Sequence, residues 1–597
     1  MTPRSSRLLL LILLLALVCL GACDADSNHD QLDHAPDDDH DADDDDSGAD
    51  DDLGDDDDAP WDPDGPWNPE LTGHPRLEFG PEDLARLRER ATAEPHSTLL
   101  DRLRSKAARN PRPRGDFYDA SLEYDYANVC RAAAFVYLID GDQQLRDKAL
   151  QMLLELATEL VPPDLEMIMD DIHVAEAIQG WVFAADYLLD DPALSDEQRE
   201  LIRWRLGRLG ENFFDLMVRT AYPARMFNPN NHEIKTACAL GLLAMLLPDH
   251  PDSRRWINYA ATAVDLLCTV QTTDGGADGT DVGWAEGPYY YMYTTVNLLP
   301  FWAAYQRLVG EDRTWHLRSC DFFGNNCRWE PYEVVNYLDN PRWLELNLWA
   351  LSIRMPDGLR PALDDSLHRN NFGVLLAALY DEPLFAWDWL TSPAHPWFTI
   401  WCADLAADIY TLWDGRSEPP AATFGPSFYF PEAGNAVFRS DWSQGAVYGF
   451  FIAEHGRIRE HGYSHEHADG LSLIVHAHGE LFAIDSGYGD YSQHDELNQG
   501  RDHNLILVDQ IGPAGPNRVG YGGDDAFLDR WFDLGALQYA RGSSSYAGVQ
   551  IERHVAFVDR ARFVVFDRVA SDQQHDYDLL WHLLAGGDTA NLYSQRP

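Results

Sequence analysis

The stretch YSHEHADGLSLIVHAHGELFAIDSG, residues 463–487, decides the fold of the C-terminal part of the chain. Two short apolar runs flank the segment AHGE, residues 477–480, whose glycine favours a tight turn. This pattern predicts a β-hairpin. A hairpin needs no imidazoles or carboxylates at its ends, yet four such residues stand there: His465, His467, Asp469 and Asp485.

The polar residues at the ends of this hairpin indicate a metal site. In a strand, residues two apart point to the same side, so His465 and His467 can face one site. With the turn at AHGE, Asp485 falls near Ser472 and is brought toward His467. His503 opens the next predicted strand and can supply a third ligand, and two imidazoles with one carboxylate suit zinc. The alternative is that these residues are ordinary polar strand ends.

The strand pattern of the hairpin continues on both sides of it. Short β-branched or aromatic runs such as NAVFRSDW, AVYGFFIAEHG, NLILVD and ARFVVFDRVA are separated by Gly and Asp. They begin at the segment PPAATFGPSFYF, residues 419–430. We therefore expect an antiparallel β-sandwich domain over residues 419–597.

Residues 71–418 carry the period of helices instead. Apolar residues recur at spacings of three and four in LQMLLELATEL, HVAEAIQGWVFAADYLL and INYAATAVDLLCTV. Ser195 stands three residues before Gln198, which is the spacing of a capping box. Pro and Gly clusters separate the helical segments. Many antiparallel helices without a strict sequence repeat favour an N-terminal α/α toroid over a helical solenoid.

Two clusters in the helical part carry residues suited to chemistry. The first, FNPNNHEIKTACALGLLAML, places three polar residues at the start of an apolar helix: Asn230, Asn231 and His232. An Asn at such a position is often only a helix N-cap. The second, DGGADGTDVGWAEGPYYYMYT, runs from a loop into Glu286 and then into four tyrosines: Tyr289, Tyr290, Tyr291 and Tyr293. Four tyrosines at one helix start cannot all face a core, so we expect at least one to line a groove.

The first residues of the chain predict export and a lipid anchor. Arg4 and Arg7 precede LLLLILLLALVCLGAC, an apolar run that is short for a membrane span and ends in small residues. LGAC has the form of a bacterial lipobox, in which Cys23 becomes the lipidated first residue. We expect a lipoprotein signal peptide over residues 1–22 and a protein anchored by lipid in the bacterial cell envelope, in the periplasm or at the outer-membrane surface. A plain signal peptide or an uncleaved anchor is the alternative.

An acidic segment follows, and we expect residues 23–70 to be a disordered linker. Its first 43 residues contain 21 Asp and no Lys or Arg, so they repel one another and offer little to a core. Without these Asp and the two Arg of the signal, 78 acidic residues remain against 43 basic ones, which reduces the net charge from −54 to about −35. An acidic body argues against nucleic-acid binding, and mildly against highly sulfated polymers.

Several short motifs occur in one order along the chain: HPRLEF from His74, then NNH, EGPYY, HEHAD and DSGYGDY, followed by HN. Together they resemble the heparinase II/III-like polysaccharide lyases, including their alginate-lyase relatives, over nearly everything from His74 to the C-terminus. The resemblance implies an α/α toroid followed by an antiparallel β-domain, with the active site between them. It also implies an enzyme that cleaves a uronic-acid-containing polysaccharide by β-elimination and leaves 4,5-unsaturated products.

The resemblance implies roles for individual residues. Asn231 and His232 fall on the family's Asn–His pair, Tyr290 on its catalytic Tyr with Tyr289 as the rival, and His465 on the catalytic His of the β-domain. A structural zinc ion, with no organic cofactor, is implied for three ligands: His467, Asp485 and His503. We expect three further residues to contact substrate: Asn230, Glu286 and Tyr289. SHEH replaces the commoner Gly before and between the histidines, which is a departure from the family pattern.

The expected reaction assigns tasks to these groups. A base must remove the C5 proton, an acid must protonate O4, and the substrate carboxylate must be neutralised. Tyr290 is the expected acid, or acid and base together, with His465 or His232 as the base when the two groups lie on opposite faces. Asn231 is expected at the carboxylate, helped by His232 or by an Arg, for which three residues are candidates: Arg457, Arg459 and Arg501.

Two other functions compete with this reading. A glycoside hydrolase on an α/α toroid needs two carboxylates across a cleft, and Glu286 with Asp281 or Asp274 are the candidates. A non-catalytic glycan-binding surface lipoprotein would keep the aromatic residues and leave the proton-transfer residues idle.

Overall fold

The computed structural model describes residues 66–583, apart from residue 69 and residues 112–119, 161–170, 216–230, 311–312, 320–327, 367–372, 393–404, 463–464, 490–493 and 514–523. The chain divides between Asp58 and Ala59, and all described residues belong to the second unit. The expected signal peptide, Cys23, most of the Asp-rich segment and Asn230 lie outside the described residues. Within the described ranges, no helix has the length and apolar character needed to cross a membrane.

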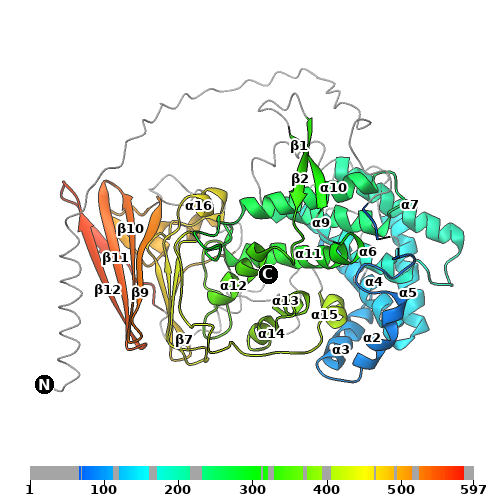
Figure 1. Ribbon diagram of the computed structural model, residues 1–597, viewed down its shortest axis with the longest axis horizontal. Coiled ribbons are helices and arrows are strands. Elements are labelled where there is room, and N and C mark those ends of the chain that lie inside the picture. The colour runs from blue at the N-terminus through cyan, green and yellow to red at the C-terminus, as the bar shows by residue number, and fades with distance from the viewer. Residues whose placement is uncertain are drawn as a thin grey trace. The chain divides into compact units, whose positions relative to one another are not determined.

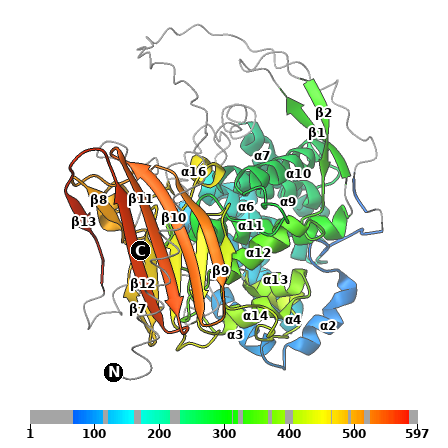
Figure 2. The ribbon, with the colours of Figure 1, turned by 60° about the vertical axis from the view of Figure 1, so that its left-hand side comes forward.

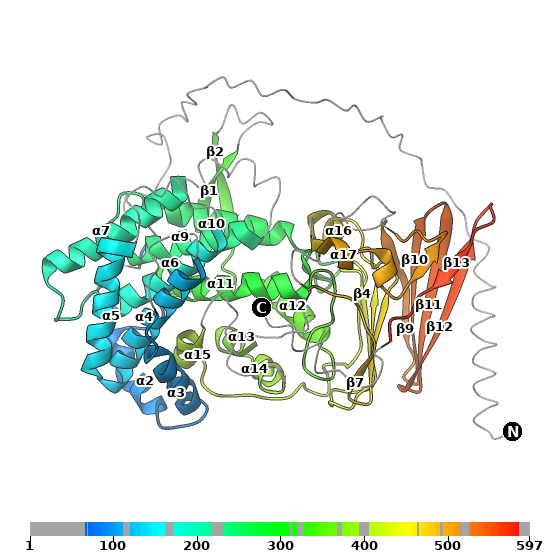
Figure 3. The ribbon, with the colours of Figure 1, turned by 180° about the vertical axis from the view of Figure 1, so that it is seen from behind.

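The helical part forms the expected toroid (Figures 1 and 3). Packing runs from α3 through α4, α6, α9, α11, α13 and α15 and returns from α15 to α3, which closes a ring; α5, α7, α10 and α14 each pack against members of that ring. The helices are α2 (Leu84–Arg90), α3 (His96–Ala107), α4 (Ala120–Asp140), α5 (Gln143–Glu155), α6 (Asp171–Leu188), α7 (Asp196–Phe213), α9 (Asn231–Leu246), α10 (Ser253–Val270), α11 (Gly287–Leu308), α12 (Pro341–Ser352), α13 (Gly373–Leu379), α14 (Pro383–Leu390) and α15 (Ala406–Leu412), with short helices η2 (Pro81–Asp83) and η4 (Leu156–Leu160).

Local sequence sets where these helices begin. Ser195 caps α7 by accepting a hydrogen bond from the Gln198 backbone N–H, and the Gln198 side chain accepts one from Ser195, as the capping-box spacing predicts. Helix α11 begins at Gly287, whose φ is 72°. A side chain at Gly287 would meet the carbonyl oxygen of Leu363 at 2.8 Å, so this close approach requires glycine.

The C-terminal part consists of antiparallel strands, as expected. A five-stranded sheet has the order β3-β4-β5-β6-β7, a four-stranded sheet has the order β12-β11-β10-β9, and β13 pairs with β8 (Figure 2). The strands are β3 (Phe428–Phe430), β4 (Asn435–Arg439), β5 (Tyr448–Ile452), β6 (Leu473–Ala477), β7 (Glu480–Ala483), β8 (Ile506–Val508), β9 (Ala526–Asp533), β10 (Leu537–Tyr546), β11 (Val549–Val558), β12 (Arg562–Ala570) and β13 (Tyr577–Leu579), with short helices α16 (Arg457–Gly462), α17 (His494–Leu497) and η8 (Gly500–Asp502). A hairpin of β1 (Arg313–Ser319) and β2 (Arg328–Val334) belongs to the helical part.

Strands β4 and β5 of the five-stranded sheet are buried on both faces. On β5, Phe450 and Ile452 join the apolar core of the helical part, whereas Phe451 between them joins the core shared with β10 and β11. Neighbouring residues of a strand face opposite sides, so one sheet serves two cores. This explains why the sequence of β4 and β5 is almost continuously apolar. It also places the loops of this sheet directly beside the helices.

The hairpin of β6 and β7 has the predicted turn. Ala477 pairs with Glu480, and the two residues between them, His478 and Gly479, both have positive φ, as a two-residue primed turn requires. The expected neighbourhood of Ser472 and Asp485 is present: the Ser472 hydroxyl donates to Asp485 Oδ2 over 3.5 Å. The register shifts between Val475 and His476, so the pairing beyond that point differs by one residue.

Candidate active site

Tyr290 and His465 meet where the start of α11 touches the segment before β6. Their ring centroids lie 3.8 Å apart, with 31° between the ring planes. The Tyr290 hydroxyl lies 3.3 Å from the hydroxyl of Tyr488, which follows the DSG segment. The toroid and the β-domain thus each contribute to one cluster of rings.

The four tyrosines of α11 are all buried, contrary to the expectation that they cannot all be so. Residues of the β-domain cover the start of the helix. They therefore also enclose the tyrosines that we expect to line a groove. Tyr290 is the most exposed of the four, at 9%, and faces His465. Tyr289 stacks on Tyr293 and also contacts the ring of Tyr488, so it belongs to the same cluster of rings.

Asp365 holds His465 in place. The Nδ1 atom of His465 lies 2.9 Å from Asp365 Oδ2, and the Asp365 backbone N–H donates to the His465 carbonyl over 3.1 Å. A carboxylate only accepts, so Nδ1 carries the proton and Nε2 keeps the lone pair. That Nε2 atom lies 3.5 Å from Glu286 Oε1. The imidazole is therefore oriented with its basic nitrogen toward the start of α11.

Asn231 belongs to the same cluster through Glu286. The Asn231 side-chain amide donates to Glu286 Oε1 over 3.1 Å, and both residues are fully buried. His232 is half-buried next to Asn231 and acts electrostatically on Glu286. The structure therefore brings together five of the residues expected at the catalytic and substrate-binding site: Asn231, His232, Glu286, Tyr290 and His465.

Burial sets the protonation of two of these groups. Burial raises the pKa of Glu286, although His465, Asn231 and His232 lower it in part. Burial also raises the pKa of the Tyr290 phenol well above its ordinary value, and the neighbouring Tyr488 adds to the shift. Both shifts favour the protonated form, so Tyr290 keeps its proton at neutral pH and can act as a donor.

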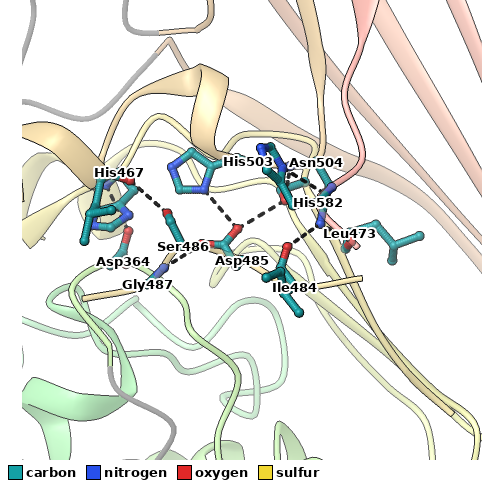
Figure 4. A network of polar contacts seen from close by, with 12 residues as sticks. Asp364, His467, Leu473, Ile484, Asp485, Ser486, Gly487, His503, Asn504 and His582 are labelled. Carbon is teal, nitrogen blue, oxygen red and sulfur yellow. Dashed lines mark hydrogen bonds and ion pairs between the residues drawn. The ribbon is translucent and has the colours of Figure 1, made fainter. Parts of the chain in front are cut away.

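The three expected metal ligands converge at the other end of the same segment. Ligand atoms of His467, Asp485 and His503 all lie within 4.8 Å of one another, and all three residues are buried. His503 Nδ1 lies 2.9 Å from Asp485 Oδ2, and Figure 4 shows the His503 ring directed at that carboxylate. Burial lowers the pKa of His503, but Asp485 outweighs burial and raises it to about 9.

The donor set fits zinc. His467 Nε2 lies 3.0 Å from Asp365 Oδ1, so this nitrogen carries a proton and Nδ1 is the nitrogen suited to a metal. His503 Nε2 is buried without a hydrogen-bond partner among the described residues, which suits a ligand atom. Two imidazoles and one carboxylate are a common ligand set for zinc. Asp365 thus contacts both the candidate metal ligand His467 and the candidate base His465.

The sequence did not reveal three residues that the structure places here. Asp364 and Asp365 come from the loop between α12 and α13, and their only signal is a carboxylate pair within the apolar stretch RPALDDSL. Tyr488 lies just after the quoted DSG and pairs its backbone N–H with Ser366 in the same loop. This loop connects the two parts of the site, and nothing local in the sequence indicates that connection.

The other candidate residues have structural partners elsewhere. Asp281 accepts hydrogen bonds from the backbone N–H groups of Glu432 and Ala433, and Asp274 pairs with Arg457 at the surface. Arg459 pairs with Asp525, and Arg501 is largely exposed beside Asp502. Asp281 and Asp274, the two candidates to pair with Glu286 in a glycoside hydrolase, are therefore engaged in structural contacts.

Comparison with known proteins agrees with this architecture. Residues 423–592 match the family described as heparinase II/III-like, C-terminal. No curated protein matches the chain. The solved heparinase III-BT4657 gene product is 15% identical, with a TM-score of 0.53, over 86% of this chain and 80% of that one. The heparan sulfate lyase HepC from Pedobacter heparinus is 15% identical, with a TM-score of 0.51, over 84% and 75%.

A further solved structure, titled heparinase III, is 12% identical, with a TM-score of 0.51, over 86% of this chain and 81% of that one. At such identities the likeness concerns the fold. Residues 423–592 therefore match the heparinase II/III-like C-terminal family model, and 86% of the chain shares the fold of the heparinase III-BT4657 gene product.

Proposed function

We propose that this protein is a polysaccharide lyase that cleaves a uronic-acid-containing polysaccharide by β-elimination. The observation that carries the proposal is the contact of Tyr290 with His465, which joins a phenol and an imidazole of fixed orientation in one buried cluster. The solved structures of the same fold are titled heparinase III and heparan sulfate lyase, which supports the reaction class.

His465 acts as the base in this proposal. Asp365 accepts a hydrogen bond from the Nδ1–H group of His465, so the lone pair of Nε2 is available to remove the C5 proton of the uronate. After the transfer, Asp365 stabilises the imidazolium, because an opposite charge favours the charged form. Asp365 is thus a positioning residue that acts through His465.

Tyr290 acts as the acid. Its phenol is protonated because burial raises its pKa, and it protonates the O4 oxygen as the glycosidic bond breaks. Tyr488 lies within hydrogen-bond distance of the Tyr290 hydroxyl and can return a proton to it after the reaction. The C5 proton and the O4 leaving group then have separate partners.

Glu286, Asn231 and His232 neutralise the substrate carboxylate. The C5 proton is acidic only when the adjoining carboxylate does not oppose a developing negative charge. Burial raises the pKa of Glu286 and so favours its protonated carboxyl, which can donate to that carboxylate, and the Asn231 amide lies beside it. A negatively charged Glu286 would repel the same group, so the direction of its pKa shift favours this role.

Zinc, bound by His467, Asp485 and His503, is proposed as a structural ion. When bound, it supplies a fixed coordination geometry to the segment that carries His465, two residues before His467. Asp365 contacts both histidines, so the position of His467 affects the position of His465. No catalytic step is assigned to the ion.

Export and lipidation of Cys23 are proposed as well, on the form of residues 1–23. Metabolic labelling with a fatty acid, in wild type beside Cys23→Ser, tests this proposal. Label in the wild type alone is expected, and label in both or in neither would contradict it.

Ultraviolet absorbance during incubation with a panel of uronic-acid polysaccharides tests the proposed reaction. A rise from the new conjugated double bond, absent in Tyr290→Phe, is the expected result and identifies the polymer. New reducing ends without that absorbance would indicate hydrolysis. Binding of a polymer that leaves it intact would support the glycan-binding alternative instead.

A further inference from the structure

A second group of buried carboxylates lies beside the candidate zinc ligands. Ligand atoms of Asp364, Glu454 and Asp469 all lie within 4.8 Å of one another. The three residues are 1%, 3% and 3% exposed, and they come from three separate segments. Asp364 belongs to the loop before α13, Glu454 follows β5, and Asp469 precedes β6. A fourth buried carboxylate, Glu466, adds to the negative charge.

The carboxylates of this group have oxygen atoms without partners. Asp364 Oδ2, Glu454 Oε2 and Asp469 Oδ2 are buried and make no hydrogen bond among the described residues. The other oxygen of Asp364 accepts from the His467 backbone N–H over 3.2 Å, and Figure 4 labels both residues. Buried charged oxygens are costly unless something pairs with them. Three such atoms on three segments indicate a shared partner.

Among the described residues, no Lys, Arg or His forms an ion pair with Asp364, Glu454 or Asp469, and Glu466 has only a long one. Arg459 lies 3.9 Å from Glu466 through its Nε atom, and its Nη1 atom pairs with Asp525 instead. A small cavity adjoins the group and is lined by Glu454, Arg459, Glu466, His467, Asp469, Gly470 and Asp524. The three carboxylates therefore have buried oxygen atoms without partners among the described residues, and two of them line a narrow cavity.

We propose that Asp364, Glu454 and Asp469 bind a divalent calcium ion. Every donor is a carboxylate oxygen, the ligand type that calcium selects, whereas the neighbouring His467, Asp485 and His503 set contains the nitrogen donors that suit zinc. Two ligands at about 2.4 Å from one ion are at most about 4.8 Å apart, and these atoms all lie within 4.8 Å of one another. The two candidate centres thus select different metals.

A calcium ion at this position would link the toroid to the β-domain. Asp364 is in the toroid, and Glu454 and Asp469 are in the β-domain, so one ion ties the two parts together beside the candidate active site. Asp364 has a positive φ of 54°, a backbone conformation that costs free energy for a residue with a side chain. Ligation of its carboxylate offsets that cost and fixes the adjoining Asp365.

The first test measures thermal unfolding of the full-length protein after treatment with a chelator and titration with calcium chloride alone. Calcium is expected to raise the wild-type melting temperature by several degrees. In Glu454→Gln, which keeps the shape of the side chain and removes one charge, we expect this rise to disappear. We also expect this variant to melt above the wild type in chelator, because the repulsion is weaker. Glu418→Gln, at an exposed site, is the matched control and keeps the wild-type response.

A second measurement counts bound calcium per chain by equilibrium dialysis, with Asp364→Asn beside the wild type. The Asp-rich segment of residues 23–65 is the same in both proteins, so its weak binding cancels in the difference. We expect one calcium ion fewer in the variant. Equal calcium in both proteins, or no calcium-dependent rise in the wild-type melting temperature, would overturn the proposal and leave the carboxylates sharing protons instead.

Discussion

The phenol ring of Tyr290 lies against the imidazole ring of His465, with 3.8 Å between the ring centroids. Tyr290 belongs to a helix of the toroid, and His465 belongs to the β-domain. Neither part of the chain holds both residues, so the candidate site exists only where the two parts are packed together.

Substitution by phenylalanine distinguishes the role of Tyr290 from that of Tyr289. Tyr290→Phe removes the proposed donor and keeps the ring against His465, so we expect kcat to fall by about 10²–10⁴-fold with little change in KM. Tyr289→Phe keeps the Tyr290 hydroxyl, and we expect a change of less than about tenfold. Initial rates of unsaturated product formation measure both. A large loss in Tyr289→Phe with near-normal Tyr290→Phe would reverse the assignment.

Asp365→Asn tests the positioning of His465. Asparagine keeps the size of the side chain, but its amide can present a donor to Nδ1, which favours the wrong tautomer of the imidazole. We expect kcat to fall by about 10²–10⁴-fold while thermal stability changes little. The pH dependence of kcat should also shift, because the partner of the base is no longer charged. An unchanged pH profile would mean that Asp365 has only a structural role.

Metal removal tests the His467, Asp485 and His503 centre. We expect one zinc ion per chain by elemental analysis, and a lower melting temperature after chelation. His503→Ala should lose the zinc and the response to the chelator. His96→Ala removes another buried imidazole, which lies 2.7 Å from the Trp413 carbonyl, and should lower stability but retain zinc. Zinc retained in His503→Ala would exclude this centre.

The raised pKa of Asp265 should make the free energy of unfolding depend on pH. Burial raises its pKa from 3.8 to about 6. Between these values the folded protein binds more protons than the unfolded chain, so the free energy of unfolding falls as pH rises, by about 3 kcal/mol in total. Asp265→Asn still accepts from the Tyr332 hydroxyl and should lack this loss. Denaturant unfolding at pH 4 and pH 7 measures the difference, and equal losses in both proteins would contradict the shift.

Much of the fold could be predicted from the sequence because its signals are local. The periods of three to four and of two residues separate helices from strands. The AHGE turn fixes the hairpin register, and that register brings Asp485 to Ser472. The convergence of His467, Asp485 and His503 follows from strand geometry once the turn is placed.

The remainder depends on contacts between distant segments. Asp365 reaches His465 and His467 from a loop about a hundred residues earlier, and no spacing rule connects them. Burial of all four tyrosines on α11 also escaped prediction, because the covering residues belong to the β-domain. The start of a helix and the loops of a sheet come together only in the folded protein. An amphipathic pattern shows which face of a helix is apolar, but not which distant loop packs against it.

The most direct test of the account is mass spectrometry of the products from a defined uronic-acid oligosaccharide. β-Elimination adds no water, so the masses of the two products should sum to the mass of the substrate, and the new non-reducing end should carry the double bond. His465→Ala should yield neither product at a measurable rate. Products whose masses sum to the substrate plus one water molecule would contradict the account and show that the protein is a hydrolase.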